Sequence, residues 1–479
     1  MPARSRLPLG LKLAYSVGGV AFGIKDFGLK FFLMLYYNQV LGVPATWVGA
    51  ASAVALCVDA VVDPVIGYWS DNLHSRWGRR HPPMYAAMLP IALAYGLLWD
   101  PPSGLGQAGL CVYLFGMTVL VRILISFYEV PNSALTPDLT DDYDERTSVV
   151  GFRIVFGLAG GLGLVVLALV AFLRPTDTDT AGQLVAAGYV KYGWASAFFM
   201  LATSLVSALG THRRIPLLKP APPRQPFAFE RSRREIWQSM SHPSLRRALG
   251  AIFFAGLAGG LGSTLSYYYN TYFWELTPPQ TIVLVGGLFV GMLVAMPLGA
   301  GLARRYEKKG AALALVVASL INGPLPQLLR LLGWFPPNGH PALLPLLFLH
   351  SLVATALGLA AAMLIIAMVT DIVEDSQVET GRRSEGLFLA SATLVNKCAT
   401  GVGLLASGAL IDAIGFPLHA VPGQVEPAIL RNLVLAYTPA IILLYLLMLG
   451  FLATYRIDRA RHEANLRHLA EVAAAPGAS

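Results

Sequence analysis

The sequence predicts an all-α integral membrane protein with twelve transmembrane helices arranged in two six-helix bundles. Three observations predict this class: an apolar composition, apolar segments of about 20 residues that recur along the chain, and basic residues concentrated in alternate loops, with Arg174 the main exception. Hydrophobic residues make up 55% of the 479 residues, charged residues only 13%, and the mean hydropathy is +0.59. Soluble domains are far more polar, and a membrane β-barrel would show short alternating strands instead.

Each apolar segment is long enough to form one membrane helix. The twelve segments begin near Leu13, Trp47, Pro83, Ala108, Gly151, Lys191, Ala248, Thr281, Gly310, Ala342, Gly386 and Leu430. The ninth is interrupted by Pro324 and Pro326, and the third is short before Asp100. The first segment is long, contains Lys25 and Asp26 and lacks a small-residue cleavage site. We therefore interpret it as a helix of the mature protein rather than a signal peptide.

Arginine and lysine gather in alternate loops, as short cytoplasmic loops do. The clusters are Arg4, Arg6 and Lys12; Arg76, Arg79 and Arg80; Arg213 and Arg214; Arg304, Arg305, Lys308 and Lys309; Arg382 and Arg383; and Arg456, Arg459 and Arg461. With twelve helices, all of them fall on one side of the cell (inner) membrane, so both termini are predicted to be cytoplasmic. Because the net charge of +8 comes from these loops, it does not indicate nucleic-acid binding. The three cysteines lie in apolar segments and are interpreted as packing residues.

A long loop rich in proline and arginine divides the predicted helices six and six. It predicts an N-terminal bundle at residues 1–210, a cytoplasmic linker at 211–247, a C-terminal bundle at 248–456 and a cytoplasmic tail at 457–479. A weak repeat supports the duplication: residues 67–80 join the second and third helices, and residues 299–310 join the eighth and ninth. Parallel repeats of this kind are typical of two-bundle transporters.

Two carboxylates in the second helix, Asp59 and Asp63, are the sharpest functional signal in the sequence. They lie four residues apart, on one helical face. Ionisable groups inside a membrane are costly, so they mark candidate functional sites. Two neighbouring anions in a medium of low dielectric constant favour a shared proton or a bound cation. The alternative is structural: Asp59 pairs with a basic partner, while Asp63 caps or packs at the membrane edge.

The fourth helix carries Arg122, Ser126 and Glu129 on roughly one stripe. We hypothesise that Glu129 joins Asp59 and Asp63 in a cation site, with Ser126 as a neutral ligand, because hard cations bind oxygen donors. The sequence does not distinguish Na⁺, H⁺ and Li⁺, and it predicts no other cofactor.

Other buried charges are assigned to coupling and to substrate binding. Lys397 in the eleventh helix is expected to approach the cation site from the opposite bundle and to compete with the ion. Asp26 in the first helix and Arg153 in the fifth are free to hydrogen-bond a polar substrate, the carboxylate as acceptor and the guanidinium as donor. Asp26 and its neighbour Lys25 point about 100° apart on a helix, so they are expected to have different partners.

Charged residues at the predicted cytoplasmic ends are candidates for gating. They are Asp71, Arg79, Arg80, Asp371 and Glu374. For Asp371 and Glu374, which lie near Arg382 and Arg383, surface salt bridges are the alternative. An acidic loop at residues 138–146 is either a solvated loop or part of a salt-bridge network.

Aromatic residues gather in the seventh helix, near its predicted outer end. They are Tyr267, Tyr268, Tyr269, Tyr272 and Trp274. We interpret Tyr272 and Trp274 as part of an interfacial aromatic belt. Tyr268 or Asn270 is a candidate for lining a cavity.

Taken together, these motifs resemble the glycoside-pentoside-hexuronide:cation symporters, the melibiose-permease-like branch of the major facilitator superfamily. The specific pieces are Tyr15-Ser-Val-Gly, Lys25-Asp26-Phe27, Asp59-Ala-Val-Val-Asp63-Pro-Val-Ile-Gly67, Ser75-Arg-Trp-Gly78, Glu129-Val-Pro131, Asp371-Ile-Val-Glu374 and Lys397. The resemblance spans nearly the whole chain and implies the major facilitator fold and cation-coupled sugar uptake. It implies an ion site at the helix-two carboxylates and Glu129 with Lys397 nearby, and sugar contacts at Lys25, Asp26, Glu129 and Arg153.

Two departures from the family pattern bear on the substrate. The family's characterised sugar carriers have aspartate where this chain has Glu129, and a ring-stacking aromatic residue where it has Ser133. Related branches of the fold carry lysophospholipids, so a lipid is the second hypothesis. A membrane enzyme is a third, but the chain has no Walker A, HExxH or GxSxG motif. We expect a monomer that binds a small molecule and a monovalent cation.

Overall fold

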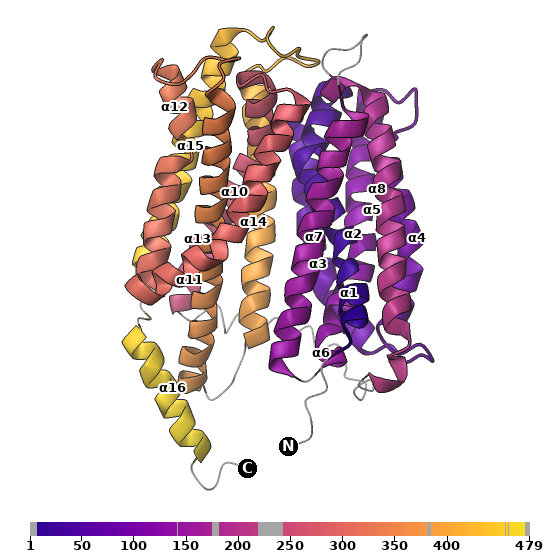
Figure 1. Cartoon of the computed structure of the whole chain (residues 1–479), viewed down its shortest axis with the longest axis vertical. Coiled ribbons are helices and arrows are strands. Elements are labelled where there is room, and N and C mark those ends of the chain that lie inside the picture. The colour runs from indigo at the N-terminus through magenta and orange to yellow at the C-terminus, as the bar shows by residue number, and fades with distance from the viewer. Residues whose placement is uncertain are drawn as a thin grey trace. The chain divides into compact units, whose positions relative to one another are not determined.

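The computed structural model describes residues 7–140, 142–174, 182–218, 243–380, 385–455, 457 and 459–474. Within these ranges every regular element is a helix, which confirms the all-α prediction (Figure 1). Most of the predicted linker, together with Arg382 and Arg383, lies outside the described residues.

Residues 9–217 form a first series of helices that reproduces the predicted apolar segments. They are α1 (Leu9–Val17), α2 (Gly19–Phe31), η1 (Leu35–Val40), α3 (Ala45–Asp71), α4 (His81–Leu98), α5 (Gln107–Ala134), α6 (Thr136–Leu139), α7 (Tyr143–Leu167), η2 (Ala168–Phe172), η3 (Gly182–Leu184), α8 (Ala186–His212) and η4 (Ile215–Leu217). The first predicted membrane segment is therefore built from α1, α2 and η1 in succession.

Residues 243–474 form the second series. They are α10 (Pro243–Tyr268), η5 (Tyr269–Phe273), α11 (Pro278–Asn322), α12 (Leu325–Leu331), α13 (Leu343–Thr380), α14 (Glu385–Ala413), α15 (Pro427–Ala453) and α16 (Arg459–Ala474). The backbone of α11 leaves helical geometry at Glu307 (φ 61°, ψ 165°), where the eighth and ninth predicted segments meet. Nine helical stretches of the described chain are long and apolar enough to cross a membrane. The count of twelve stays a prediction.

The chain divides into two compact units. The first unit comprises residues 1–227, 263–279 and 404–425, and the second comprises residues 228–262, 280–403 and 426–479. The division passes through α10 and α14, so the end of each of these helices packs with the N-terminal series. The predicted domain limits near residues 210 and 248 stay a prediction.

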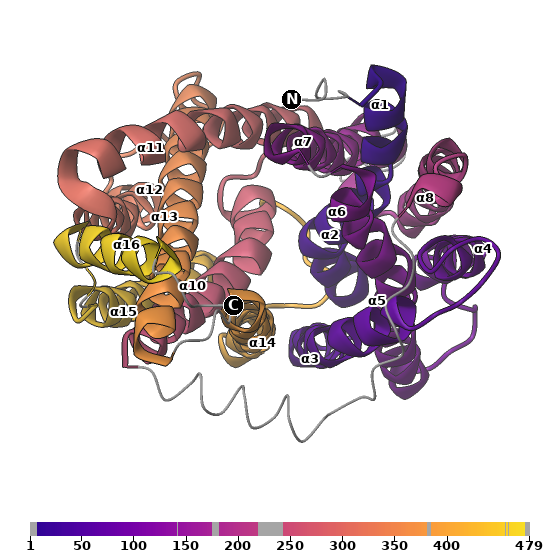
Figure 2. The ribbon, with the colours of Figure 1, turned by 90° about the horizontal axis from the view of Figure 1, so that it is seen from below.

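In the first unit, α2 and α7 pack backbone to backbone at glycines. A Cβ added to Gly23 would lie 1.9 Å from the carbonyl oxygen of Gly157, and one added to Gly19 would lie 2.6 Å from that of Arg153. Small residues permit this close approach between membrane helices. Figure 2 shows α2 and α7 among the clustered helices α1 to α8. The contact fixes Lys25 and Asp26 on α2 relative to Arg153 on α7.

The second unit has an apolar core formed mainly by α10, α11, α13 and α15. Tyr455, just after α15, is part of this core. Its hydroxyl donates a hydrogen bond of 2.9 Å to the carbonyl oxygen of Met368. Burial raises the pKa of Tyr455, so the hydroxyl stays protonated and acts as the donor.

Candidate functional site

Asp59 on α3 faces Arg122 on α5. Arg122 Nη1 lies 3.5 Å from Asp59 Oδ2, and the two side chains are only 8% and 6% exposed. The hydroxyl of Ser126 donates to Asp59 Oδ1 at 3.1 Å and to the carbonyl oxygen of Arg122 at 3.0 Å. A buried carboxylate needs a counter-charge, and Arg122 supplies it. The structure thus favours the alternative that Asp59 has a basic partner.

The other two carboxylates of the hypothesised cation site have different surroundings. Asp63 lies one turn further along α3 and is half-buried, and Glu129 forms an ion pair with Arg153 of α7. Among the described residues, no group of three histidine, cysteine or acidic side chains is placed to hold a metal ion. Asp59 already has a guanidinium as its counter-charge and accepts a hydrogen bond from Ser126, so the assignment of these residues to a cation site stays a prediction.

The Glu129–Arg153 pair is more open than the Asp59–Arg122 pair. Arg153 Nη2 donates to Glu129 Oε1, and the side chains are 18% and 21% exposed. Arg153 Nε and Glu129 Oε2 have no hydrogen-bond partner in the described part of the chain, although both atoms are buried. Buried polar atoms without a partner are costly, so such atoms call for a ligand, a water or a functional explanation. The pair offers one donor and one acceptor side by side.

Lys25 and Asp26 have different surroundings, as their spacing predicts. Lys25 is buried, and its ammonium lies 4.3 Å from the ring centroid of Phe22. Asp26 is half-buried and accepts a hydrogen bond of 2.7 Å from Lys30, one turn along α2. Lys397 is half-buried on α14, in the second unit, whereas Asp59 belongs to the first. Its role in coupling stays a prediction.

The predicted gating residues Asp71, Arg79 and Arg80 form an ion-pair network with Asp138 within the first unit. Arg80 lies 2.5 Å from Asp71, and Arg79 donates to both carboxylate oxygens of Asp138 at 2.9 and 3.1 Å. Asp138, which the sequence placed in an acidic loop, lies in the short helix α6 and joins this network from there. Its gating role stays a prediction.

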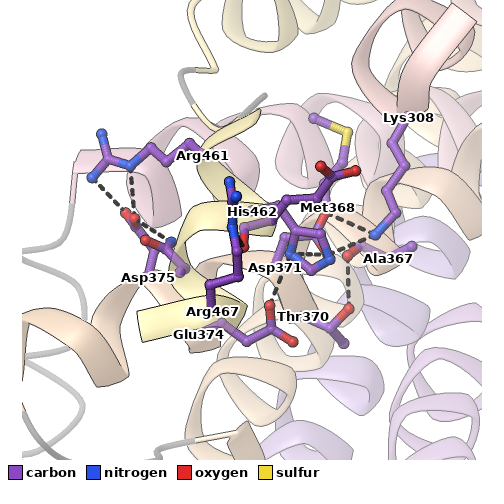
Figure 3. A network of polar contacts seen from close by, with 12 residues as sticks. Lys308, Ala367, Met368, Thr370, Asp371, Glu374, Asp375, Arg461, His462 and Arg467 are labelled. Carbon is purple, nitrogen blue, oxygen red and sulfur yellow. Dashed lines mark hydrogen bonds and ion pairs between the residues drawn. The ribbon is translucent and has the colours of Figure 1, made fainter. Parts of the chain in front are cut away.

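Asp371 and Glu374 belong to a second network, at the end of α13, which the C-terminal helix α16 joins (Figure 3). Lys308 Nζ lies 2.6 Å from Asp371, and His462 Nδ1 lies 2.8 Å from Glu374. Arg461 pairs with Asp375 through two hydrogen bonds of 2.7 and 2.9 Å. The sequence predicts these α16 residues to lie in the cytoplasmic tail and names no partner for them, although their basic side chains were a signal for the acidic end of α13.

The aromatic residues of the seventh predicted helix are buried, so the interfacial-belt interpretation of Tyr272 and Trp274 is wrong: they are 0% and 3% exposed. Within the first unit, the hydroxyl of Tyr268 donates to Asn38 at 2.6 Å, and that of Tyr272 donates to Gln39 at 3.2 Å. Neither of these two amides was among the residues predicted from the sequence. Their place in an apolar segment was the available signal, because a buried amide needs a polar partner.

Comparison with known proteins agrees with this architecture. A profile of the family described as "MFS/sugar transport protein" matches residues 14–459. The chain belongs to the MFS/sugar transport protein family. This membership confirms the predicted family resemblance and the prediction of a membrane transporter rather than an enzyme.

Relatives of this MFS protein are known in bacteria and animals. It is 26% identical to an uncharacterised symporter of Synechocystis sp., over 95% of this chain and 96% of the relative. It is 23% identical to the isoprimeverose transporter of Lactiplantibacillus pentosus, over 90% of this chain and 86% of the relative. It is also 23% identical to sodium-dependent lysophosphatidylcholine symporter 1 of Xenopus tropicalis, over 97% and 90%.

Solved structures support the fold. The inward-open xylose transporter of E. coli aligns with a TM-score of 0.60 at 14% identity, over 96% of this chain and 99% of the transporter. At this identity the likeness shows the fold alone. The predicted major facilitator superfamily fold is therefore confirmed.

Proposed function

We propose that this protein is a cation-coupled symporter of a sugar or glycoside-like solute that works by alternating access. The proposal places it in the cell membrane with both termini in the cytoplasm, and takes the two predicted six-helix bundles as its moving parts. One observation carries it: the Glu129–Arg153 pair presents a buried acceptor and a buried donor that have no partner among the described residues.

A hydroxyl group fits this pair chemically. It donates one hydrogen bond and accepts others, so one sugar hydroxyl can donate to Glu129 Oε2 and accept from Arg153 Nε. Hydrogen bonds to charged groups are stronger than those between neutral groups. The half-exposed Asp26, on the helix that packs against α7, is a second candidate acceptor.

The names of two relatives support transport, and one of them symport, but they differ in the substrate that they give. One is named an isoprimeverose transporter and the other a sodium-dependent lysophosphatidylcholine symporter. Ser133 stands where the family's characterised sugar carriers have a stacking ring, and its hydroxyl donates to the carbonyl oxygen of Val130 at 2.9 Å. A lysophospholipid or another amphipathic solute is therefore the second candidate substrate.

Uptake by the purified protein in liposomes tests the proposal. Labelled sugars, glycosides, uronates and lysolipids are offered under an imposed proton or Na⁺ gradient. We expect concentrative uptake of at least one hydroxylated solute, and its loss in Arg153→Met and Glu129→Gln. Arg431→Met is the matched control, because Arg431 is an exposed arginine at the start of α15 and should retain uptake.

The outcomes separate the alternatives. Uptake of lysolipids but not of sugars would favour the second candidate substrate. No gradient-driven uptake of any tested solute, or full uptake by both pair variants, would contradict the proposed function.

A further inference from the structure

We infer that Arg122 determines the ion selectivity of this carrier: its guanidinium occupies the cation position at Asp59 and excludes Na⁺ and Li⁺ from it. The inference rests on the proposed symport, because ion selectivity matters only in a coupled carrier. Its test, however, measures ion binding and does not require a known substrate.

Charge balance is the first argument. The Asp59 carboxylate carries one negative charge and Arg122, 3.5 Å away, carries one positive charge. The guanidinium cannot lose its proton in a protein. A metal ion added beside Asp59 would bring a second positive charge to this ion pair, whose side chains are less than a tenth exposed and where charge is poorly tolerated.

The neighbouring oxygen donor gives the second argument. A serine hydroxyl that ligates a metal ion must turn a lone pair toward the ion. Here the Ser126 hydroxyl directs its hydrogen toward Asp59 Oδ1 and the Arg122 carbonyl oxygen. Both partners are acceptors, so Ser126 is the donor in each contact. It stabilises the ionised carboxylate beside a guanidinium and points its hydrogen, rather than a lone pair, toward Asp59.

The positions along the helices give the third argument. Arg122 and Ser126 lie one turn apart on α5, so the residue that brings the charge and the residue that brings the hydroxyl share one face. Asp59 lies opposite on α3, which packs directly against α5. The guanidinium is thus held by the fold in the place that a mobile cation would otherwise take.

Na⁺ binding to the full-length purified protein tests the inference. Thermal unfolding is followed while NaCl replaces choline chloride at constant ionic strength. We expect no saturable, Na⁺-specific rise of the melting temperature in the wild type or in Arg122→Lys, which keeps the positive charge. Arg122→Met should gain such a rise, and the double variant Asp59→Asn with Arg122→Met should lose it again.

Each outcome decides the inference. A saturable Na⁺-specific stabilisation of the wild type would overturn it, and so would a folded Arg122→Met that gains no response to Na⁺. If Arg122→Met folds only in Na⁺, the inference is supported. If it folds in neither salt, the response of the wild type decides alone. Failure of the proposed function would appear instead as missing uptake under every gradient, whatever the Na⁺ binding.

Discussion

Replacing Gly23 with alanine should destabilise the first unit, because α2 and α7 touch at this residue. The new Cβ would lie 1.9 Å from the carbonyl oxygen of Gly157. A carbon and a carbonyl oxygen normally stay about 3.3 Å apart or more, so the helices must separate by roughly 1.4 Å at this point. The obstacle is backbone and cannot rotate away. Overpacking of this kind costs about 1–3 kcal/mol, and we expect a loss toward the upper end.

Gly163→Ala is the matched control in the same pair of helices. Gly163 lies on α7, where an added Cβ meets no atom within 4 Å. Alanine favours a helix over glycine by up to about 1 kcal/mol, so this variant should be neutral or slightly more stable. The melting temperature of each purified variant, followed by tryptophan fluorescence, measures the difference. Equal melting temperatures for Gly23→Ala and Gly163→Ala would refute the argument for close packing of α2 and α7.

Three further predictions concern polar contacts within one unit. Asp412 accepts hydrogen bonds from the first two backbone N–H groups of α3, at 3.1 and 2.8 Å. Asp412→Ala should lower the free energy of unfolding by about 0.5–2 kcal/mol, as loss of a helix cap does; an unchanged midpoint of chemical unfolding would contradict this prediction. Tyr268→Phe, which removes the bond to Asn38, should lower the free energy of unfolding by about 0.5–1.5 kcal/mol; no loss in the same assay would count against that bond. Arg461→Ala should remove two of the hydrogen bonds that join α16 to Asp375, leaving the one from Asn465, and should speed proteolysis of α16; an unchanged cleavage rate would contradict a role of Arg461 in holding α16.

The fold was predictable because lipid imposes a simple rule on sequence. Every backbone polar group in the membrane must be satisfied by the protein itself, and a long apolar run does this within one segment only as a helix. Where the chain departs from regular helix, the sequence was less informative. Pro324 did mark the break between α11 and α12, but no residue pattern indicated that Glu307 adopts a left-handed conformation. Glycine is the residue expected there.

The candidate site was predictable in its residues but not in their pairing. Asp59, Arg122, Glu129 and Arg153 all stand out as charges in apolar helices. Their partners depend on how α3, α5 and α7 are rotated and packed, which a periodic pattern on each helix does not specify. Arg122 and Glu129 share a stripe on α5, yet one meets α3 and the other meets α7. The sequence therefore grouped three carboxylates, two of which pair with different arginines in the fold.

The two pairs have the same chemistry but differ in exposure, and this difference assigns them different roles. A carboxylate and a guanidinium that are 6% and 8% exposed are almost entirely removed from water, so breaking the pair leaves a buried charge at a cost of about 3–5 kcal/mol. Such a pair is suited to a fixed arrangement. The Glu129–Arg153 pair is about three times as exposed and keeps an unsatisfied donor and acceptor. A polar solute can complete those hydrogen bonds without displacing the pair, so we propose recognition at Glu129 and Arg153 and ion selectivity at Asp59 and Arg122.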